Sequence, residues 1–231
     1  MVEYKDGDQV LEGYLSYDDK GKNRPVIILV HDWMGLADNI KKNSDRLAKE
    51  GYVAFAADIY GKGNRPKDQK EAGAFAGKFK SDRPLLRKRI QLAVDTAKQQ
   101  PKVDANKVAA IGYCFGGTTV LELARSGADV DGIVSFHGGL DTTMPAQSMK
   151  PKILVLHGAD DPFVPTKDVA AFEDEMKKVN ANWELTKYSG AVHAFTNPEA
   201  GNDNSKGAAY NEQADKRSWI AMSNFLQEIF R

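Results

Sequence analysis

The stretch Val108-Ala-Ala-Ile-Gly-Tyr-Cys-Phe-Gly-Gly117 decides the fold. Its first four residues, 108–111, form a continuous apolar run, which is typical of a parallel strand buried on both faces. A helix is expected over residues 119–124, so Cys114 lies in a sharp turn between a strand and a helix. The glycines two positions before and after Cys114 leave room for that turn, which holds the cysteine in a strained conformation with its side chain exposed.

The rest of the chain alternates short apolar runs with amphipathic helical patterns. The predicted strands are residues 26–30, Val53–Ala57, 108–111, Gly132–Phe136, 153–156 and Trp183–Tyr188. The predicted helices are residues 39–50, 85–98, 166–178 with Thr166 as N-cap, and 213–230. Residues 10–17 are expected to form an antiparallel edge strand, and residues 61–70 and 198–207 to form surface loops. This order predicts one domain over residues 1–231, with a doubly wound, mostly parallel sheet flanked by helices.

The composition is ordinary for a soluble globular protein, with 42% apolar and 28% charged residues. Lys plus Arg and Asp plus Glu both number 32, so no net positive charge attracts a phosphate backbone and no nucleic acid partner is expected. The apolar runs are strand-sized and the N-terminus lacks an apolar signal core. We therefore expect a cytoplasmic protein without membrane association, although a signal peptide removed earlier would leave no trace.

Cys114 is the one cysteine of the chain, so no intrachain disulfide is possible. It replaces serine in the pattern Gly-x-Ser-x-Gly, the nucleophile elbow. The N-terminus of the following helix favours negative charge and therefore a thiolate. The alternative is a buried structural cysteine that packs as a small apolar side chain. Its position between a strand and a helix, with glycines on both sides, favours a nucleophile.

The general base is expected downstream of the nucleophile, because around such elbows an acid and then a histidine follow along the chain. His193 alone among the four histidines lies beyond a candidate acid, in the loop after the last strand. His31 precedes Cys114. His137 and His157 follow directly on predicted strands and are expected to be packed or surface side chains without a catalytic role.

The candidate acids are Asp160 and Asp161, in the loop after the strand 153–156. We favour Asp161. A carboxylate beside His193 would fix the ring tautomer and stabilise the imidazolium that forms during catalysis. The alternative for Asp161 is a turn-forming role before Pro162.

Backbone N–H groups are expected to stabilise the oxyanion. One belongs to Phe115, the residue after the nucleophile, and the other lies at about Trp33, in the loop after the strand 26–30.

These motifs together resemble the dienelactone hydrolase family of the α/β-hydrolase superfamily. The similar residues are Asp32-Trp-Met-Gly35, Ala57-Asp-Ile-Tyr60, Gly112-Tyr-Cys-Phe-Gly-Gly117, Asp161-Pro-Phe-Val-Pro165 and His193-Ala-Phe195. The resemblance implies an α/β-hydrolase fold, a Cys–His–Asp triad, no cofactor, and hydrolysis of an ester or lactone through a thioester. It also implies that an acidic residue of the first loop contacts the nucleophile and helps to form the thiolate. Asp32 holds that position, one methylene shorter than the usual glutamate.

The sequence departs from the family pattern in one further place. Members that act on dienelactone carry an arginine shortly after the catalytic histidine, whereas residues 193–198 here include no basic side chain. We therefore expect small, neutral, activated esters or lactones as substrates. Trp33, Tyr60, Phe115 and Phe195 are candidates for the wall of an apolar pocket, and the alternative for each is an ordinary core position. Arg65 and Arg83 are expected to be solvated surface charges. The expected range of substrates extends to phosphotriesters, since an oxyanion hole also stabilises a phosphoryl oxygen.

Two other functions fit parts of the sequence. A non-catalytic or redox-sensing protein would use an exposed Cys114, but it would need neither His193 nor Asp161 in this order, and no second cysteine could resolve the oxidised thiol. A metal-dependent hydrolase would need a cluster such as His-Glu-x-x-His, which is absent, so no metal is expected. The expected partner is a small-molecule ester or lactone, and the chain is expected to be a monomer or a homodimer.

Overall fold

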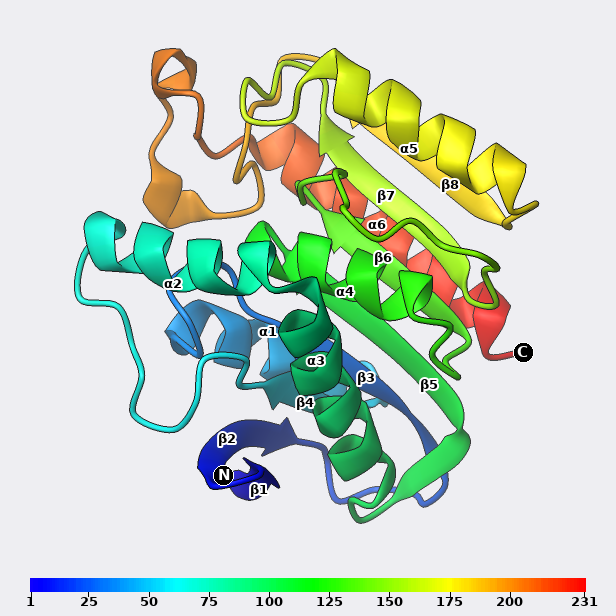
Figure 1. The fold of residues 1–231 in the computed structure, drawn as a ribbon. Helices are drawn as coiled ribbons and strands as arrows, with labels where there is room; N and C mark the ends of the chain where they lie inside the picture. Colours follow the sequence, from blue (N-terminus) through cyan, green and yellow to red (C-terminus); the bar gives the residue numbers. More distant parts are fainter.

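An eight-stranded sheet forms the centre of the computed structural model, which describes all 231 residues. The strands lie in the order β1-β2-β4-β3-β5-β6-β7-β8 (Figure 1). Every neighbouring pair from β4 to β8 is parallel, whereas β1 and β2 join antiparallel. The strands are β1 (Val2–Asp6), β2 (Gln9–Ser16), β3 (Arg24–Val30), β4 (Val53–Ala57), β5 (Val103–Tyr113), β6 (Gly132–Phe136), β7 (Lys152–Gly158) and β8 (Trp183–Tyr188). The predicted mostly parallel, doubly wound sheet is confirmed.

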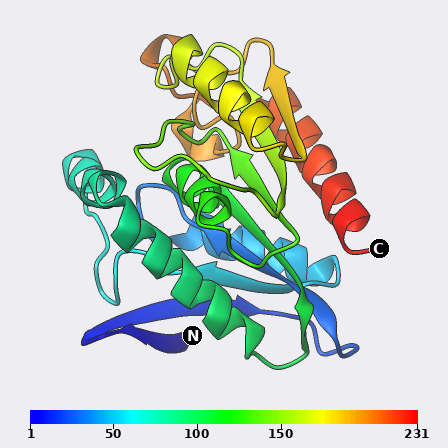
Figure 2. The same ribbon diagram turned by 45° about the vertical axis from the view of Figure 1, so that its right-hand side comes forward.

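Helices cover both faces of this sheet (Figures 1 and 2). Helices α1 (Asp38–Lys49) and α6 (Glu212–Ile229) pack on one face. The opposite face carries α2 (Gln69–Ser81), α3 (Arg83–Lys98), α4 (Phe115–Arg125) and α5 (Thr166–Lys178). The two-residue period of a strand explains this division, because β3 sends Ile27 to the first face and Ile28 to the second. A strand buried on both faces must be apolar throughout, as residues 26–30 are.

The structure differs from the expectations at one edge of the sheet and at two helices. Strand β2 is not the edge, because β1 pairs along its outer side. Thr166 does not cap α5; it is the first residue of that helix, and Pro165 holds the N-cap position without a side-chain hydrogen bond. Helix α2 was not expected, since its glycines and few apolar positions weaken the helical pattern, but the Asp68 side chain caps it by accepting from the Glu71 N–H.

The loops that hold the candidate functional residues lie together at one edge of the sheet. Trp33, Cys114, His137, Asp161 and His193 each follow the carboxyl end of a parallel strand. Such ends are where ligands bind in doubly wound folds. Residues 198–207 form a loop with two single-turn helices, η1 (Pro198–Ala200) and η2 (Asn204–Lys206). None of the helices combines the length and the apolar composition that a bilayer crossing needs.

Candidate active site

Cys114 sits in the tight turn between β5 and α4, with φ 54° and ψ −113°. The glycines around it permit the turn. A Cβ on Gly112 would lie 1.9 Å from the carbonyl oxygen of Gly116, and one on Gly116 would lie 2.2 Å from that of Val30. Any side chain at these positions would force the first turn of α4 away from β3 and β5. The left-handed conformation of Cys114 is thus maintained by backbone packing on both sides, and it is unusual for a residue that has a Cβ.

His193 links Cys114 to Asp161 in one hydrogen-bonded series. Its Nε2 lies 3.0 Å from Cys114 Sγ, and its Nδ1 lies 2.8 Å from Asp161 Oδ2. Because an ionised carboxylate only accepts, Nδ1 carries a proton and Nε2 is the atom directed at the thiol. The other oxygen of Asp161 accepts from the Phe163 N–H at 2.8 Å. Asp160 is turned away, and its carboxylate accepts from the N–H of Gly190.

Backbone contacts between the loops after β7 and β8 bring Asp161 and His193 together. The N–H of Asp160 donates to the carbonyl of Ala191 at 3.0 Å. A Cβ on Gly158 would lie 2.7 Å from the carbonyl oxygens of Ala191 and Val192, so only glycine permits this approach. On its other side His193 is held by residues 207–209, because its N–H donates to Gly207 and its carbonyl accepts from Ala209.

Burial would lower the pKa of His193, but the charges beside it outweigh that effect. The Cys114 thiolate and the Asp161 carboxylate stabilise the imidazolium and raise the pKa of His193 to about 10. The arrangement therefore favours the imidazolium form of His193 near neutral pH.

Two backbone amides at the site are free to donate. The N–H of Phe115 is the first of α4, where no intrahelical acceptor exists, and the N–H of Trp33 makes no hydrogen bond within the chain. The Trp33 peptide is held in place by Tyr60, whose hydroxyl donates to the Trp33 carbonyl at 3.1 Å. Trp33 follows β3 and Phe115 follows β5, and these two strands are direct neighbours in the sheet, so both amides lie at its carboxyl edge.

Asp32 does not reach Cys114 in this structure. Its two carboxylate oxygens accept from the Met34 N–H at 2.8 Å and from Asn39 Nδ2 at 3.0 Å. The shorter side chain therefore closes its own loop and ties it to α1, and it makes no hydrogen bond to the thiol. The role implied by the family pattern needs the extra reach of glutamate.

The expected pocket residues are core residues. Phe195 is fully buried among Tyr188 and His137, so it forms no accessible wall. Tyr60 is 3% exposed, packs against Phe115 and supports Trp33 through its hydroxyl. The large aromatic side chain that is accessible at the site is Phe163, which is 60% exposed and lies edge-on to His193 with ring centres 5.4 Å apart. Its place two residues after Asp161 could have indicated this position.

The sequence pattern also did not reveal a role for His137, which was expected to be a packed or surface side chain. The His137 ring is buried, and its Nδ1 lies 3.1 Å from the backbone N–H of Cys114, which it shares as an acceptor with the carbonyl of Phe136 at 2.9 Å. Its Nε2 lies 2.8 Å from Thr196 Oγ1, in the loop of His193. The one available signal was its position directly after strand β6.

The two arginines differ from expectation in different ways. Arg83 is buried, not solvated, and it pairs with Asp141 at 2.9 Å and faces Glu122 at 3.9 Å. Arg65 is partly exposed and pairs with the buried Asp58 at 3.4 Å. Both guanidinium groups therefore have carboxylate partners already. No group of three or more His, Cys, Asp and Glu side chains is arranged to hold a metal ion.

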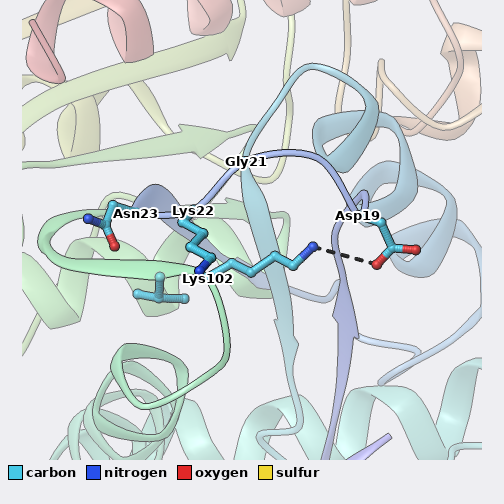
Figure 3. A pocket seen from close by; sticks show the side chains of 6 residues that line it. Asp19, Gly21, Lys22, Asn23 and Lys102 are labelled. Carbon is cyan, nitrogen blue, oxygen red and sulfur yellow. Dashed lines mark ion pairs between the residues drawn. The ribbon is translucent and has the colours of Figure 1, made fainter.

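A hollow of about 450 Å³ lies at the opposite end of the strands from Cys114. Figure 3 shows it between the loop before β3 and the start of β5, with Lys102 directed at Asp19 and Lys22 beside it. It is open and lined mainly by polar and charged residues, and it contains none of the candidate residues. The chemistry of Cys114 therefore belongs to the carboxyl edge of the sheet and not to this hollow.

Comparison with known proteins agrees with this architecture. The family model described as the dienelactone hydrolase family matches residues 11–230. A solved structure named m3DLH is 38% identical, with a TM-score of 0.94, and the match covers 99% of this chain and 96% of that chain. A dienelactone hydrolase-like promiscuous phosphotriesterase from metagenomic libraries, P91, is 39% identical with a TM-score of 0.93 and the same coverage.

A relative from Aquifex aeolicus bears the name "Putative carboxymethylenebutenolidase". It is 27% identical over 237 residues, which cover 100% of this chain and 99% of the relative. The matches extend over almost the whole length in each comparison. This chain therefore belongs to the dienelactone hydrolase family and is a hydrolase of lactones or esters.

Proposed function

We propose that the protein hydrolyses small, neutral, activated esters or lactones by nucleophilic catalysis through Cys114, with His193 as the base and Asp161 as the residue that orients it. The observation that carries this proposal is the continuous series Asp161–His193–Cys114, with contacts of 2.8 and 3.0 Å. Nucleophile, base and orienting carboxylate in mutual hydrogen-bond reach are the signature of covalent catalysis.

The reaction proceeds in two stages. The Cys114 thiolate attacks the carbonyl carbon, and the amides of Trp33 and Phe115 stabilise the oxyanion that forms. When the tetrahedral intermediate collapses, the leaving alkoxide takes the proton from His193 Nε2 and a thioester remains on Cys114. His193 then removes a proton from water, which attacks the thioester. Collapse of the second intermediate releases the carboxylic acid and restores the thiolate and the imidazolium.

The preference for neutral substrates rests on the charges near the site. The loop of His193 has no lysine or arginine in residues 194–198. Its Asn197 is uncharged, and the side-chain oxygen of Asn197 caps η1. Arg65 and Arg83 are already paired with carboxylates. A substrate carboxylate would thus lose hydration without gaining a free cationic partner, which costs on the order of several kcal/mol in a buried site.

We expect kcat/KM to fall at least about 10-fold when a carboxylate is added to an otherwise matched aryl ester, because a loss of about 1.4 kcal/mol in transition-state binding already produces that ratio. Steady-state kinetics on such a pair of esters measures the ratio. Equal or better turnover of the carboxylated ester would show a cationic subsite, and Arg65→Ala and Arg83→Ala would then identify its source.

The same site could act on phosphotriesters. A relative that is 39% identical over almost the full chain is a promiscuous phosphotriesterase. The two amides that bind a carbonyl oxyanion could also stabilise the phosphoryl oxygen as charge develops on it. Attack by Cys114 would expel the best leaving group and leave a phosphorylated cysteine, which water would then hydrolyse.

Asp161→Asn should lower kcat on the order of 10²- to 10⁴-fold, since the amide cannot stabilise the imidazolium and favours the wrong tautomer of His193. Asp160→Asn, one residue away, is the matched control, because its carboxylate contacts only the Gly190 backbone. Steady-state kinetics of both variants makes the comparison. A larger loss from Asp160→Asn would mean that the acid has been assigned to the wrong residue.

The rate of Cys114 alkylation by iodoacetamide should be nearly flat between about pH 6.5 and 9. The folded pKa of His193, about 10, lies above its ordinary value of 6.5, so the imidazolium is fully present at the lower pH and is lost only as the pH rises through about 10. In His193→Ala the rate should instead rise steeply toward pH 8.5, where an ordinary thiol ionises. A steep rise between pH 7 and 9 in the unsubstituted protein would contradict the ion pair.

A further inference from the structure

His137 joins the two loops whose separation sets the distance between Cys114 and His193. Its Nδ1 accepts from the Cys114 N–H at 3.1 Å, as a second acceptor beside the carbonyl of Phe136 at 2.9 Å. Its Nε2 lies 2.8 Å from the hydroxyl of Thr196. Thr196 is three residues after His193, in the same loop. The His137 ring also lies against the His193 ring, with centres 5.4 Å apart. One side chain thus contacts the backbone of the nucleophile, the loop of the base and the ring of the base.

The tautomer of His137 follows from these partners. A backbone N–H can only donate, so His137 Nδ1 must be the unprotonated nitrogen. The proton is then on Nε2, which donates to the oxygen of Thr196. Both ring nitrogens are used, and neither is available to take or give a proton during the reaction. His137 therefore acts through the groups that it holds.

The position of His137 is strained and buried. Its φ is 40°, in the left-handed region that side chains with a Cβ rarely adopt. It is 2% exposed, and Phe195 packs edge-on against its ring with centres 5.1 Å apart. Its own N–H donates to the carbonyl of Leu156 at 2.9 Å, which fixes it to the end of β7. Strain that is held in place by packing at a reacting centre points to a positioning function.

We propose that His137 is a positioning residue that holds the Cys114 elbow and the His193 loop at their reactive separation. The role rests on the proposed function of Cys114 and His193, and it assigns to His137 no contact with substrate.

The charge on His137 is consistent with this role. Burial, and then the positive charge of His193, hold the pKa of His137 well below its ordinary value, and His157 on β7 adds a smaller effect in the same direction. A protonated His137 would no longer accept from the Cys114 N–H, which would keep only the Phe136 carbonyl, and it would place a second cation beside His193. The neutral ring therefore leaves the positive charge of the pair on His193 alone.

Variants can separate the two halves of this bridge. His137→Phe removes both hydrogen bonds while filling much of the same space. His137→Asn places an amide oxygen near the position of Nδ1, so it retains the bond to the Cys114 N–H and loses the contact with Thr196. Thr196→Val removes the hydroxyl alone. Thr96→Val is the matched control, because the Thr96 hydroxyl bonds within α3, remote from the carboxyl edge of the sheet.

We expect kcat for an activated aryl ester to fall about 10- to 100-fold in His137→Phe and to a smaller extent in Thr196→Val, with KM little changed. His137→Asn should recover part of the loss. Thr96→Val should match the unsubstituted protein. If one bridge links the two loops, the losses from His137→Asn and Thr196→Val should not add in the double variant, because each breaks the same contact.

The alkylation profile of Cys114 distinguishes positioning from a merely structural role. In His137→Phe the alkylation rate should no longer be constant below pH 9 and should instead rise toward pH 8.5. The reason is that a wider gap between Cys114 and His193 weakens the thiolate–imidazolium pair. A lower melting temperature with unchanged kcat and an unchanged alkylation profile would overturn the proposal. Alkylation does not depend on turnover. Loss of the flat profile in His137→Phe would therefore support the bridge whatever the outcome for catalysis. Retention of esterase activity in Cys114→Ala would refute the proposed function and leave the bridge untouched.

Discussion

Cys114→Ala should lower kcat/KM for an activated aryl ester by about 10³-fold or more, on the scale of nucleophile removals in other triads. The alanine cannot form the thioester, so only water attack assisted by the remaining site is left. The thermal midpoint should change little, because Cys114 is only half-buried and its thiol contacts His193 at a partly exposed position. Steady-state kinetics and a thermal melt on the same preparation measure both quantities.

Cys114→Ser refines this expectation. A hydroxyl is far less ionised than a thiol, so the His193 imidazolium that suits a thiolate does not suit a neutral serine. We expect the serine variant to retain little activity. If Cys114→Ala retained most of its activity, the nucleophile would have to be another group, and the proposed mechanism would be wrong.

Gly112→Ala should destabilise the protein by about 4–5 kcal/mol or more, a value reached only by the strongest single substitutions. The added Cβ would lie 1.9 Å from the carbonyl oxygen of Gly116, and that oxygen belongs to the backbone of the elbow, where nothing flexible can yield. A loss of this size is a large part of the stability of a typical domain. Chemical denaturation of purified protein, with the soluble yield as a second readout, measures it.

Gly77→Ala is the matched control for this substitution. Gly77 lies within α2, and an added Cβ would meet nothing within 4 Å. Alanine is a better helix former than glycine, so this variant should be more stable by up to about 1 kcal/mol. If Gly112→Ala were as stable and as active as Gly77→Ala, the tight packing of the elbow described above would be incorrect.

The architecture was predictable because buried parallel strands leave a distinctive pattern. Residues 26–30 and Val53–Ala57 are apolar at every position, and the structure places them at the centre of the sheet. Helix α2 was missed because only three of its side chains are buried and it contains two glycines. Strand β1 was missed because it lies at the edge and buries one residue, Tyr4, so it carries almost no apolar signal.

The candidate residues of the site could be predicted where their order along the chain identifies them. The order of nucleophile, acid and histidine led to Cys114, Asp161 and His193, and the structure brings these three together. Side chains whose roles depend on distance were not predictable. Whether Asp32 reaches the thiol depends on one methylene, and whether an aromatic residue lines a pocket or the core depends on packing that the sequence alone does not show.

The central claim is that Cys114 carries the acyl group during turnover. The most direct measurement is mass spectrometry of protein that is mixed with an activated aryl ester, quenched in acid within the first turnovers and digested. We predict that the peptide containing Cys114 gains the mass of the acyl group, that Cys114→Ala gains none, and that Asp161→Asn accumulates less. Turnover of the ester without any acyl mass on the Cys114 peptide, or with that mass on another residue, would contradict the account.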